Sequence, residues 1–332
     1  MALLFIGGEV EDFVRVGTVS AELSVSGYRT SHARVAVNAH GGAWGVNYIR
    51  APFTASSSIG LTARVHTGAT NISTGQPFLW FASGGSARLR LKANSPSPTT
   101  LTLESYTSGG TATALATSTS TIAFSNIYRL DLLVSYGAAG RARLWVDGVL
   151  FIDTGTMDIT ASGSTTLDSA NFGNVRTATQ NAPWSEVIVT DGEDPRPLSL
   201  KTLVPNATGD VTGWTSGAWG DIDEYEASDT DLAVSDTANQ VLAVNCTGMP
   251  SGGSGLSVRA VKSVAYAARG ATGPSKLALG VRQSSTNAFA SGVTLDTGYG
   301  VVSQTWTTNP VTGAAFTSAE IDALQLAYRS ET

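Results

Sequence analysis

The sequence has 332 residues, a formal net charge of −6 and 14% charged residues against 42% hydrophobic ones. A chain of this length exceeds one ordinary hydrophobic core, so we expect two domains. The acidic balance leaves no basic footprint for a phosphate backbone, which argues against a nucleic-acid partner. No stretch approaches the roughly 18 apolar residues of a membrane span, which argues against membrane insertion.

Short strands are predicted throughout the first 190 residues. The 36 glycines, together with abundant Ser and Thr, suit strands and turns rather than helices. Two apolar residues, Leu89 and Leu91, alternate with three cations, Arg88, Arg90 and Lys92. This period of two predicts a strand with one face in the core and the other in water.

A second strand and a hairpin follow further along. In residues 128–136 the apolar side chains again take every second position, and residues 141–152 form two apolar runs around Asp147-Gly148. An Asp-Gly pair between two such runs is the strongest short-range hairpin signal, because a type I′ turn needs positive φ at both positions. We therefore predict a hairpin centred on Asp147 and Gly148.

The domain boundary is expected where Pro195 and Pro197 stand among charged residues. Proline cannot continue a central strand and favours an extended connector. We predict a first domain over residues 1–192, a connector over 193–200 that carries few contacts crossing between the two domains, and a smaller domain over 201–332.

The second domain has its own alternating stretches between glycine-rich turns. Near its end, Thr317 stands three residues before Glu320, which is the spacing of a helix capping box. The predicted fold class is all-β, with two β-sandwich domains of jelly-roll type and a short helical turn near the C-terminus.

Two stretches carry a resemblance to known families. Residues 128–134 followed by 142–150 resemble the penultimate strands of laminin-G and concanavalin A-like jelly rolls, where a strand precedes an Asp-Gly hairpin. Residues 184–191 and the sequence after them are similar to bacteriophage and prophage virion proteins, in which a jelly roll ends in such a strand. The counterparts of the second sandwich in that group are Leu203–Asn206, Trp214, Trp219, the acidic stretch 221–226 and the closing residues 320–326.

The resemblance implies a non-enzymatic virion protein, such as a tail fibre, a tail-tip or baseplate protein, or a capsid fibre. Such a protein is made in the host cytoplasm and then located in the virion. Its partners are other virion proteins and, for an appendage, host surface glycans or receptors. Few charges are available to protect the sheet edges, so we also expect a homo-oligomer, a trimer by analogy to phage fibres.

The acidic stretch is the main candidate for metal binding or catalysis. Its candidate ligands for a calcium ion, which prefers six to eight oxygens, are Asp221, Asp223, Glu226, Asp229 and Asp231. The first three also resemble the paired carboxylates of concanavalin A-like glycosidases. They stand in the second domain among turn residues, so a solvated acidic loop is favoured over both alternatives. The three histidines lack a partner at zinc-ligand spacing, and no cofactor is expected.

Aromatic residues are the candidates for ligand contact. Trp44 lies among Gly41, Gly42 and Gly45 in a predicted loop, and Tyr48 follows closely. Exposed Trp and Tyr rings are suited to stacking against sugars. Residues 78–81, by contrast, are apolar on both faces, which predicts a central buried strand.

Two other functions remain open at this point. One is a depolymerase that degrades host surface polysaccharide, and the other is a surface lectin. The lack of a convincing carboxylate pair within the first domain argues against the depolymerase. The short apolar run 2–6 is unlike a secretion signal, which argues against the lectin.

Overall fold

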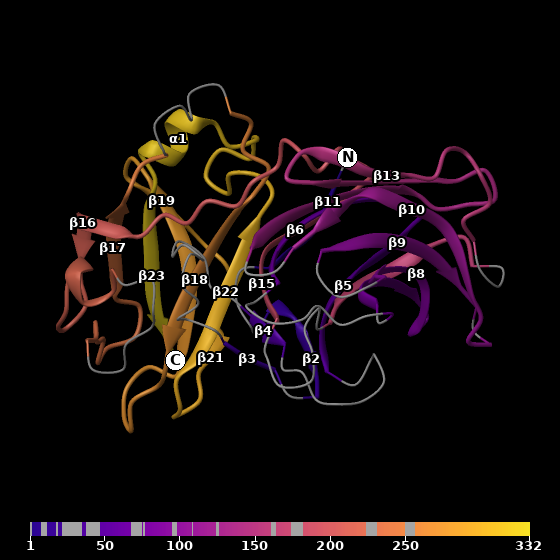
Figure 1. The fold of residues 1–332 in the computed structure, drawn as a ribbon. Coiled ribbons are helices and arrows are strands. Elements are labelled where there is room, and N and C mark those ends of the chain that lie inside the picture. The colour runs from indigo at the N-terminus through magenta and orange to yellow at the C-terminus, as the bar shows by residue number, and fades with distance from the viewer. Residues whose placement is uncertain are drawn as a thin grey trace. The chain divides into compact units, whose positions relative to one another are not determined.

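The computed structural model describes residues 2–7, 12–17, 19–21, 35–37, 47–67, 75, 77–94, 98–107, 109–123, 126–160, 164–173, 182–223, 231–249 and 256–332. The chain divides into two compact units, Met1–Lys201 and Thr202–Thr332. The predicted connector residues 193–200 all belong to the first unit. Nearly every regular element is a β-strand (Figure 1), which confirms the all-β prediction.

Two antiparallel sheets make up the first unit. The eight-stranded sheet has β1 paired with β15 and otherwise runs in the order β13 (Val149–Asp153), β12 (Arg141–Val146), β11 (Ile127–Ser135), β6 (Ser58–His66), β15 (Ala182–Asp191), β4 (Val35–Val37) and β3 (Val19–Ala21), with β1 at Leu3–Gly7. The seven-stranded sheet runs in the order β10 (Ala112–Ile122), β9 (Thr99–Tyr106), β8 (Ser86–Ala93), β7 (Pro77–Ser83), β14 (Leu167–Phe172), β5 (Tyr48–Ser56) and β2 (Val14–Val16).

One continuous hydrophobic core joins these two sheets. Its largest fully buried side chains include Trp184, Phe78, Phe81 and Phe172. The predicted central strand is confirmed, because β7 is the middle strand of its sheet and residues 78–81 are all buried. Each sheet therefore has an inner face that packs in this core and an outer face that does not.

The predicted hairpin is also confirmed. Val146 pairs with Val149 across the turn, and Asp147 and Gly148 have φ values of 48° and 81°. Positive φ at both central residues matches the right-handed twist of the flanking strands. The Asp147 carboxylate also accepts a hydrogen bond from the Arg129 backbone N–H at 2.9 Å, which ties the turn to β11.

Two sheets also build the second unit. The larger one has β21 (Val293–Thr294) paired with β19 and runs in the order β16 (Pro205–Thr212), β17 (Val241–Cys246), β23 (Gln325–Glu331), β19 (Lys276–Gln283) and β20 (Thr286–Phe289). The smaller one pairs β18 (Val261–Ala267) with β22 (Gly300–Trp306). Side chains from both sheets, including Leu242, Leu279 and Val302, share a small core.

The capping box predicted near the C-terminus is present. Thr317 precedes helix α1 (Ser318–Asp322), its hydroxyl accepts a hydrogen bond from the Glu320 N–H, and the Glu320 carboxylate accepts one from the Thr317 N–H. These hydrogen bonds hold the pKa of Glu320 below its usual value. In the part of the chain that the structure describes, no helix is long and apolar enough to cross a membrane.

Candidate binding face of the seven-stranded sheet

Register across the seven-stranded sheet aligns one row of mainly polar side chains on its outer face. From strand to strand, directly paired positions hold Arg50 on β5, Asn171 on β14, Trp80 on β7, Arg90 on β8 and Glu104 on β9. Paired residues of neighbouring antiparallel strands point to the same side of a sheet. Their sequence neighbours point to the core, so none of the five belongs to the core cluster.

Aromatic rings lie beside this row. Tyr48 is two residues before Arg50 on β5, so it shares the outer face, and its ring meets Trp80 edge-on at a centroid distance of 5.0 Å. Tyr106 lies under the guanidinium of Arg90, which is 3.7 Å from the ring centroid. Tyr48 and Tyr106 are half-buried, whereas Trp80 is buried. The face therefore offers partly accessible aromatic side chains over a buried indole.

Glu104 is fully engaged with cations. Its carboxylate accepts a hydrogen bond from Arg90 at 2.8 Å and forms an ion pair with Lys92. The Glu104 side chain is 4% exposed, and a buried carboxylate needs such partners to remain charged. This arrangement fixes Glu104 as a structural counter-ion of β8.

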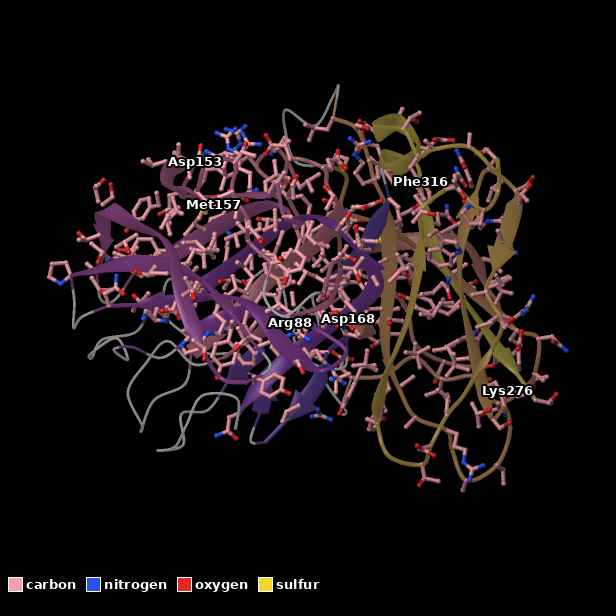
Figure 2. All side chains as sticks on the ribbon, turned by 90° about the vertical axis from the view of Figure 1, so that its right-hand side faces the viewer. Arg88, Asp153, Met157, Asp168, Lys276 and Phe316 are labelled. Atoms are coloured by element: carbon pink, nitrogen blue, oxygen red, sulfur yellow. The ribbon has the colours of Figure 1, made fainter. Side chains whose placement is uncertain are left out.

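Two further arginines of this face lack such a partner. Arg88 alternates with the core residue Leu89 and therefore shares the outer face with Arg90. Figure 2 labels Arg88 together with Asp168 of β14, a strand of the same sheet. The Nε and Nη1 atoms of Arg88 and the Nε atom of Arg50 are buried and make no hydrogen bond. Among the described side chains on or beside this face, four cations (Arg50, Arg88, Arg90 and Lys92) meet two carboxylates, Glu104 and Asp168 of β14, in a chain of net charge −6.

The alternation in residues 88–92 was the one sequence signal of this face. It placed Arg88, Arg90 and Lys92 on one side of a strand, and this is confirmed. The expectation that this side lies in water is wrong for Arg90, which is 7% exposed because it pairs with Glu104 and covers Tyr106. Arg50, Glu104 and Asn171 carried no signal of their own, because their alignment comes from strand order. Of the two predicted contact residues, Tyr48 lies on this face, and Trp44 is outside the described residues.

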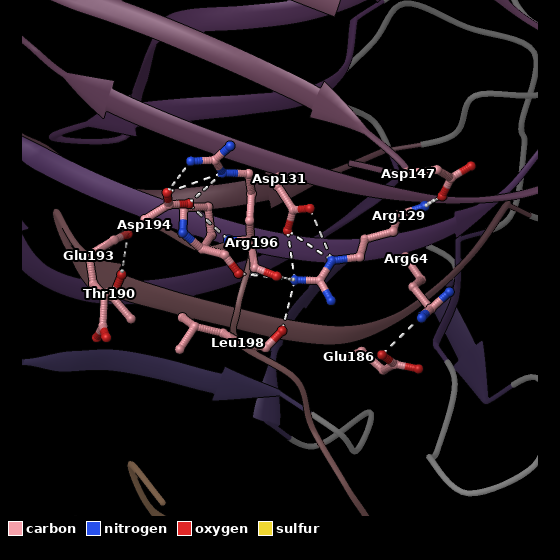
Figure 3. Close-up of polar contacts among 11 residues, drawn as sticks. Arg64, Arg129, Asp131, Asp147, Glu186, Thr190, Glu193, Asp194, Arg196 and Leu198 are labelled. Atoms are coloured by element: carbon pink, nitrogen blue, oxygen red, sulfur yellow. Dashed lines mark hydrogen bonds and ion pairs between the residues drawn. The ribbon is translucent and has the colours of Figure 1, made fainter. Parts of the chain in front are cut away.

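The outer face of the eight-stranded sheet is polar as well, and its Arg129 is satisfied by acceptors of the chain itself. Arg129 on β11 binds the Asp131 carboxylate through Nε at 3.0 Å. Its Nη2 donates to the backbone carbonyls of Pro195, Arg196 and Leu198 at 3.0, 2.9 and 2.7 Å (Figure 3). Residues 195–198 are therefore held on the first unit, to which the whole predicted connector belongs.

Two more contacts hold the connector on this face. The Arg196 guanidinium lies 4.3 Å from the centroid of the Trp145 ring on β12, a cation–π geometry. The Glu193 carbonyl approaches Gly60 on β6 so closely that an added Cβ would lie 1.9 Å from its oxygen. The connector forms a turn, in which the Leu198 N–H bonds to the Pro195 carbonyl, instead of the extended link that was predicted.

The acidic stretch of the second unit is only partly described. Asp221 ends the 3₁₀ turn η2 (Trp219–Asp221), and its carboxylate accepts a hydrogen bond from the Ala218 N–H at 2.5 Å. Glu226 and Asp229 lie outside the described residues. The structure therefore does not describe the complete predicted set of calcium ligands, of which Asp221, Asp223 and Asp231 are described. No cluster of three or more His, Cys, Asp or Glu side chains suited to a metal occurs among the residues described.

Cys246, at the end of β17, is half-buried and makes no disulfide. Desolvation raises the pKa of its thiol to about 11. Since the thiolate is the reactive form, this thiol is a poor nucleophile at neutral pH.

No family model and no curated protein matches this sequence. Among solved structures, the alginate lyase Aly36B matches with 12% identity over 54% of this chain and 96% of its own, at a TM-score of 0.35. Domain 4 of AbnA, an extracellular arabinanase from Geobacillus stearothermophilus, in complex with arabinotriose, matches with 16% identity. The match covers 53% of this chain and 76% of that one, at a TM-score of 0.35. The cellulose induced protein Cip1 matches with 16% identity over 56% of this chain and 90% of its own, at a TM-score of 0.39. Likenesses this weak determine no function for this chain.

Proposed function

We propose that this protein is a non-enzymatic, glycan-binding component of a bacteriophage particle, and that the outer face of the seven-stranded sheet is its glycan site. The observation that carries the glycan part is the association of Tyr48 and Trp80 with polar side chains of the same face. Aromatic rings supply the apolar stacking that sugar rings require, and amide and guanidinium groups supply hydrogen bonds to hydroxyls.

A binding role is favoured over catalysis because the carboxylates described near this face, Glu104 and Asp168, already accept hydrogen bonds within the chain. Glu104 is paired with Arg90 and Lys92. Asp168 of β14 accepts hydrogen bonds from the Gly84 N–H at 2.7 Å and from Ser169 at 3.1 Å. Glycoside hydrolysis requires two carboxyl groups that exchange protons or bonds with the substrate, and neither of these is available for that.

The virion part of the proposal is supported by the sequence resemblance. A homo-oligomer is supported by the edge strand β10, whose sequence ATALATSTSTI contains no Lys, Arg, Asp, Glu or Pro. Edges without such residues are open to pairing with another chain. At the neighbouring hairpin, Val149 and Leu150 are 58% and 49% exposed. We propose a trimer, to be checked by light scattering at micromolar concentration, where a mass of one chain contradicts it.

The glycan site is tested with a panel of purified bacterial capsule and O-chain polysaccharides, measured by biolayer interferometry. We expect saturable binding to at least one of them, weakened about tenfold by Tyr48→Ala, because a stacked ring contributes on the order of 1 kcal/mol beyond its buried area. Tyr266→Ala is the matched control, since Tyr266 is a 45% exposed tyrosine of the second unit. Equal binding by wild type and Tyr48→Ala contradicts the site.

The same samples test the other two parts of the proposal. Following reducing ends and the absorbance of unsaturated sugars over a day distinguishes binding from turnover, and release of either product contradicts the non-enzymatic assignment. Immunogold labelling of particles from lysed host cells tests the virion location. Labelling confined to the unassembled soluble fraction contradicts it.

A further inference from the structure

We infer that the glycan bound on this face is anionic, and that Arg50 and Arg88 are its carboxylate-binding residues. This inference rests on the proposed function and names the class of ligand: a polysaccharide with uronic acid or similar carboxylate-bearing sugars. It concerns two side chains that neither the core nor the ion pairs of the first unit employ.

The first argument is hydrogen-bond satisfaction. Buried guanidinium N–H groups are costly to leave unpaired, because folding removes their water without replacing it. Arg129, Arg141 and Arg196 all donate to acceptors of the chain itself. Arg50 and Arg88, in contrast, hold buried N–H groups with no acceptor. The Nε atoms of Arg64 and Arg90 are also buried and make no hydrogen bond, but each of these two guanidiniums has a carboxylate partner, Glu186 or Glu104. An acceptor supplied by a ligand would satisfy the N–H groups of Arg50 and Arg88.

The second argument is charge. Glu104 is shared by Arg90 and Lys92, so it does not neutralise Arg50 or Arg88 as well. Among the described side chains of this face, the cations Arg50, Arg88, Arg90 and Lys92 therefore outnumber the carboxylates Glu104 and Asp168, whereas the whole chain carries −6. A planar guanidinium matches a carboxylate through two parallel hydrogen bonds, which makes arginine the residue suited to carboxylates.

The third argument is spacing. Arg50 on β5 and the β8 arginines are separated by β14 and β7. With strands about 4.8 Å apart, these positions are on the order of 14 Å from each other. Trp80, with Tyr48 against it, lies between them in the row. Trp80 itself is buried, so the ring that a sugar can reach is that of Tyr48, on the same strand as Arg50. Two cationic positions this far apart fit a chain of several sugars with repeated charges better than a single sugar.

The test is calorimetry with three defined hexasaccharides: α-1,4-linked galacturonate, β-1,4-linked mannuronate and the neutral maltohexaose. The wild type should bind one acidic hexamer at least about tenfold more tightly than the neutral one. The double variant Arg50→Gln/Arg88→Gln should lose that preference. The affinity for the acidic hexamer should fall about tenfold for each guanidinium removed, which is the scale of one charge-assisted hydrogen bond. The affinity of this variant should also depend less on salt. Arg141→Gln, on the other sheet, is the matched control and should change neither.

The outcomes separate this inference from the proposed function. If neither acidic hexamer binds, or if the double arginine variant binds as the wild type does, the inference is overturned. The glycan site itself is tested by Tyr48→Ala on the polysaccharide panel, and the result of that test does not depend on the arginine variants. A thermal midpoint within two degrees of that of the wild type shows that the double variant is folded.

Discussion

The two sheets of the first unit use arginine differently on their outer faces. On the eight-stranded sheet, Arg129 donates to Asp131 and to three carbonyls of the chain that follows β15. On the seven-stranded sheet, Arg50 and Arg88 keep buried N–H groups without an acceptor. On the first face the arginine donates its hydrogen bonds within the chain. On the second face the arginines keep N–H groups that can donate to an acceptor of a ligand.

The difference shows how to separate structural from binding charges in a β-sandwich. A guanidinium whose N–H groups all meet acceptors of its own chain stabilises the fold, and its removal leaves those acceptors unsatisfied. A guanidinium with unmet N–H groups contributes little to the fold and is free for a ligand. Each of the following predictions tests one side of this distinction, in order of expected effect.

Arg129→Met should have the largest effect on stability. It leaves Asp131, whose side chain is 2% exposed, without its cation, and breaking a buried ion pair costs about 3–5 kcal/mol. Urea unfolding monitored by tryptophan fluorescence measures the loss. Arg129→Met/Asp131→Leu is the control, and it should recover part of the stability because no charge is then left buried.

The same variant should also free the connector. In the wild type, the bonds from Arg129 hold residues 195–198, so thermolysin should cut slowly between residues 193 and 200. In Arg129→Met the cut should be several times faster, as followed by mass spectrometry of the fragments. An equally fast cut in the wild type would mean that these bonds do not hold the connector in solution.

Glu104→Gln should cost about 3 kcal/mol, since it leaves the buried Arg90 and its neighbour Lys92 without an anion. The comparison predicts this because Glu104 satisfies two cations of the binding face from within the chain. A cycle with Arg90→Met isolates the pair, and the double variant should be less destabilised than the sum of the single changes. Additive effects would show that Glu104 and Arg90 do not interact.

An exposed ion pair on the eight-stranded sheet should matter far less. Arg141 donates to Asp153 at 2.8 and 2.5 Å, and this hydrogen bonding lowers the pKa of Asp153 from 3.8 to about 2. A lowered carboxyl pKa stabilises the folded state above pH 4, and that contribution disappears as the pH falls from about 4 to 2. Asp153→Asn should therefore lose less than about 1 kcal/mol at pH 7 and nothing at pH 2, as measured by urea unfolding at both pH values.

Much of this architecture was predictable because its signals are local. Alternation identified the strand that carries Arg88, and the Asp147-Gly148 pair identified the hairpin, since both depend on neighbours in sequence. The partners of Arg129 and the alignment of Arg50 with Trp80 were not predictable, because they depend on which strands pair and on where residues 193–198 fold back. Proline suggested a connector there, but only the structure shows that three carbonyls of its turn bind an arginine 66 to 69 residues earlier.

Arg88→Met should have the smallest effect on stability and is the sharpest test of the comparison. Methionine keeps an apolar stem of similar length, and the Arg88 guanidinium has no hydrogen bond on Nε or Nη1 to lose. The free energy of unfolding should therefore change by less than about 0.5 kcal/mol or rise slightly, because a desolvated charge is removed. Arg129→Met, the same substitution on the opposite outer face, is the matched control with its loss of several kcal/mol. A loss of 2 kcal/mol or more in Arg88→Met would show that Arg88 is satisfied within the folded chain, and the two faces would then no longer differ.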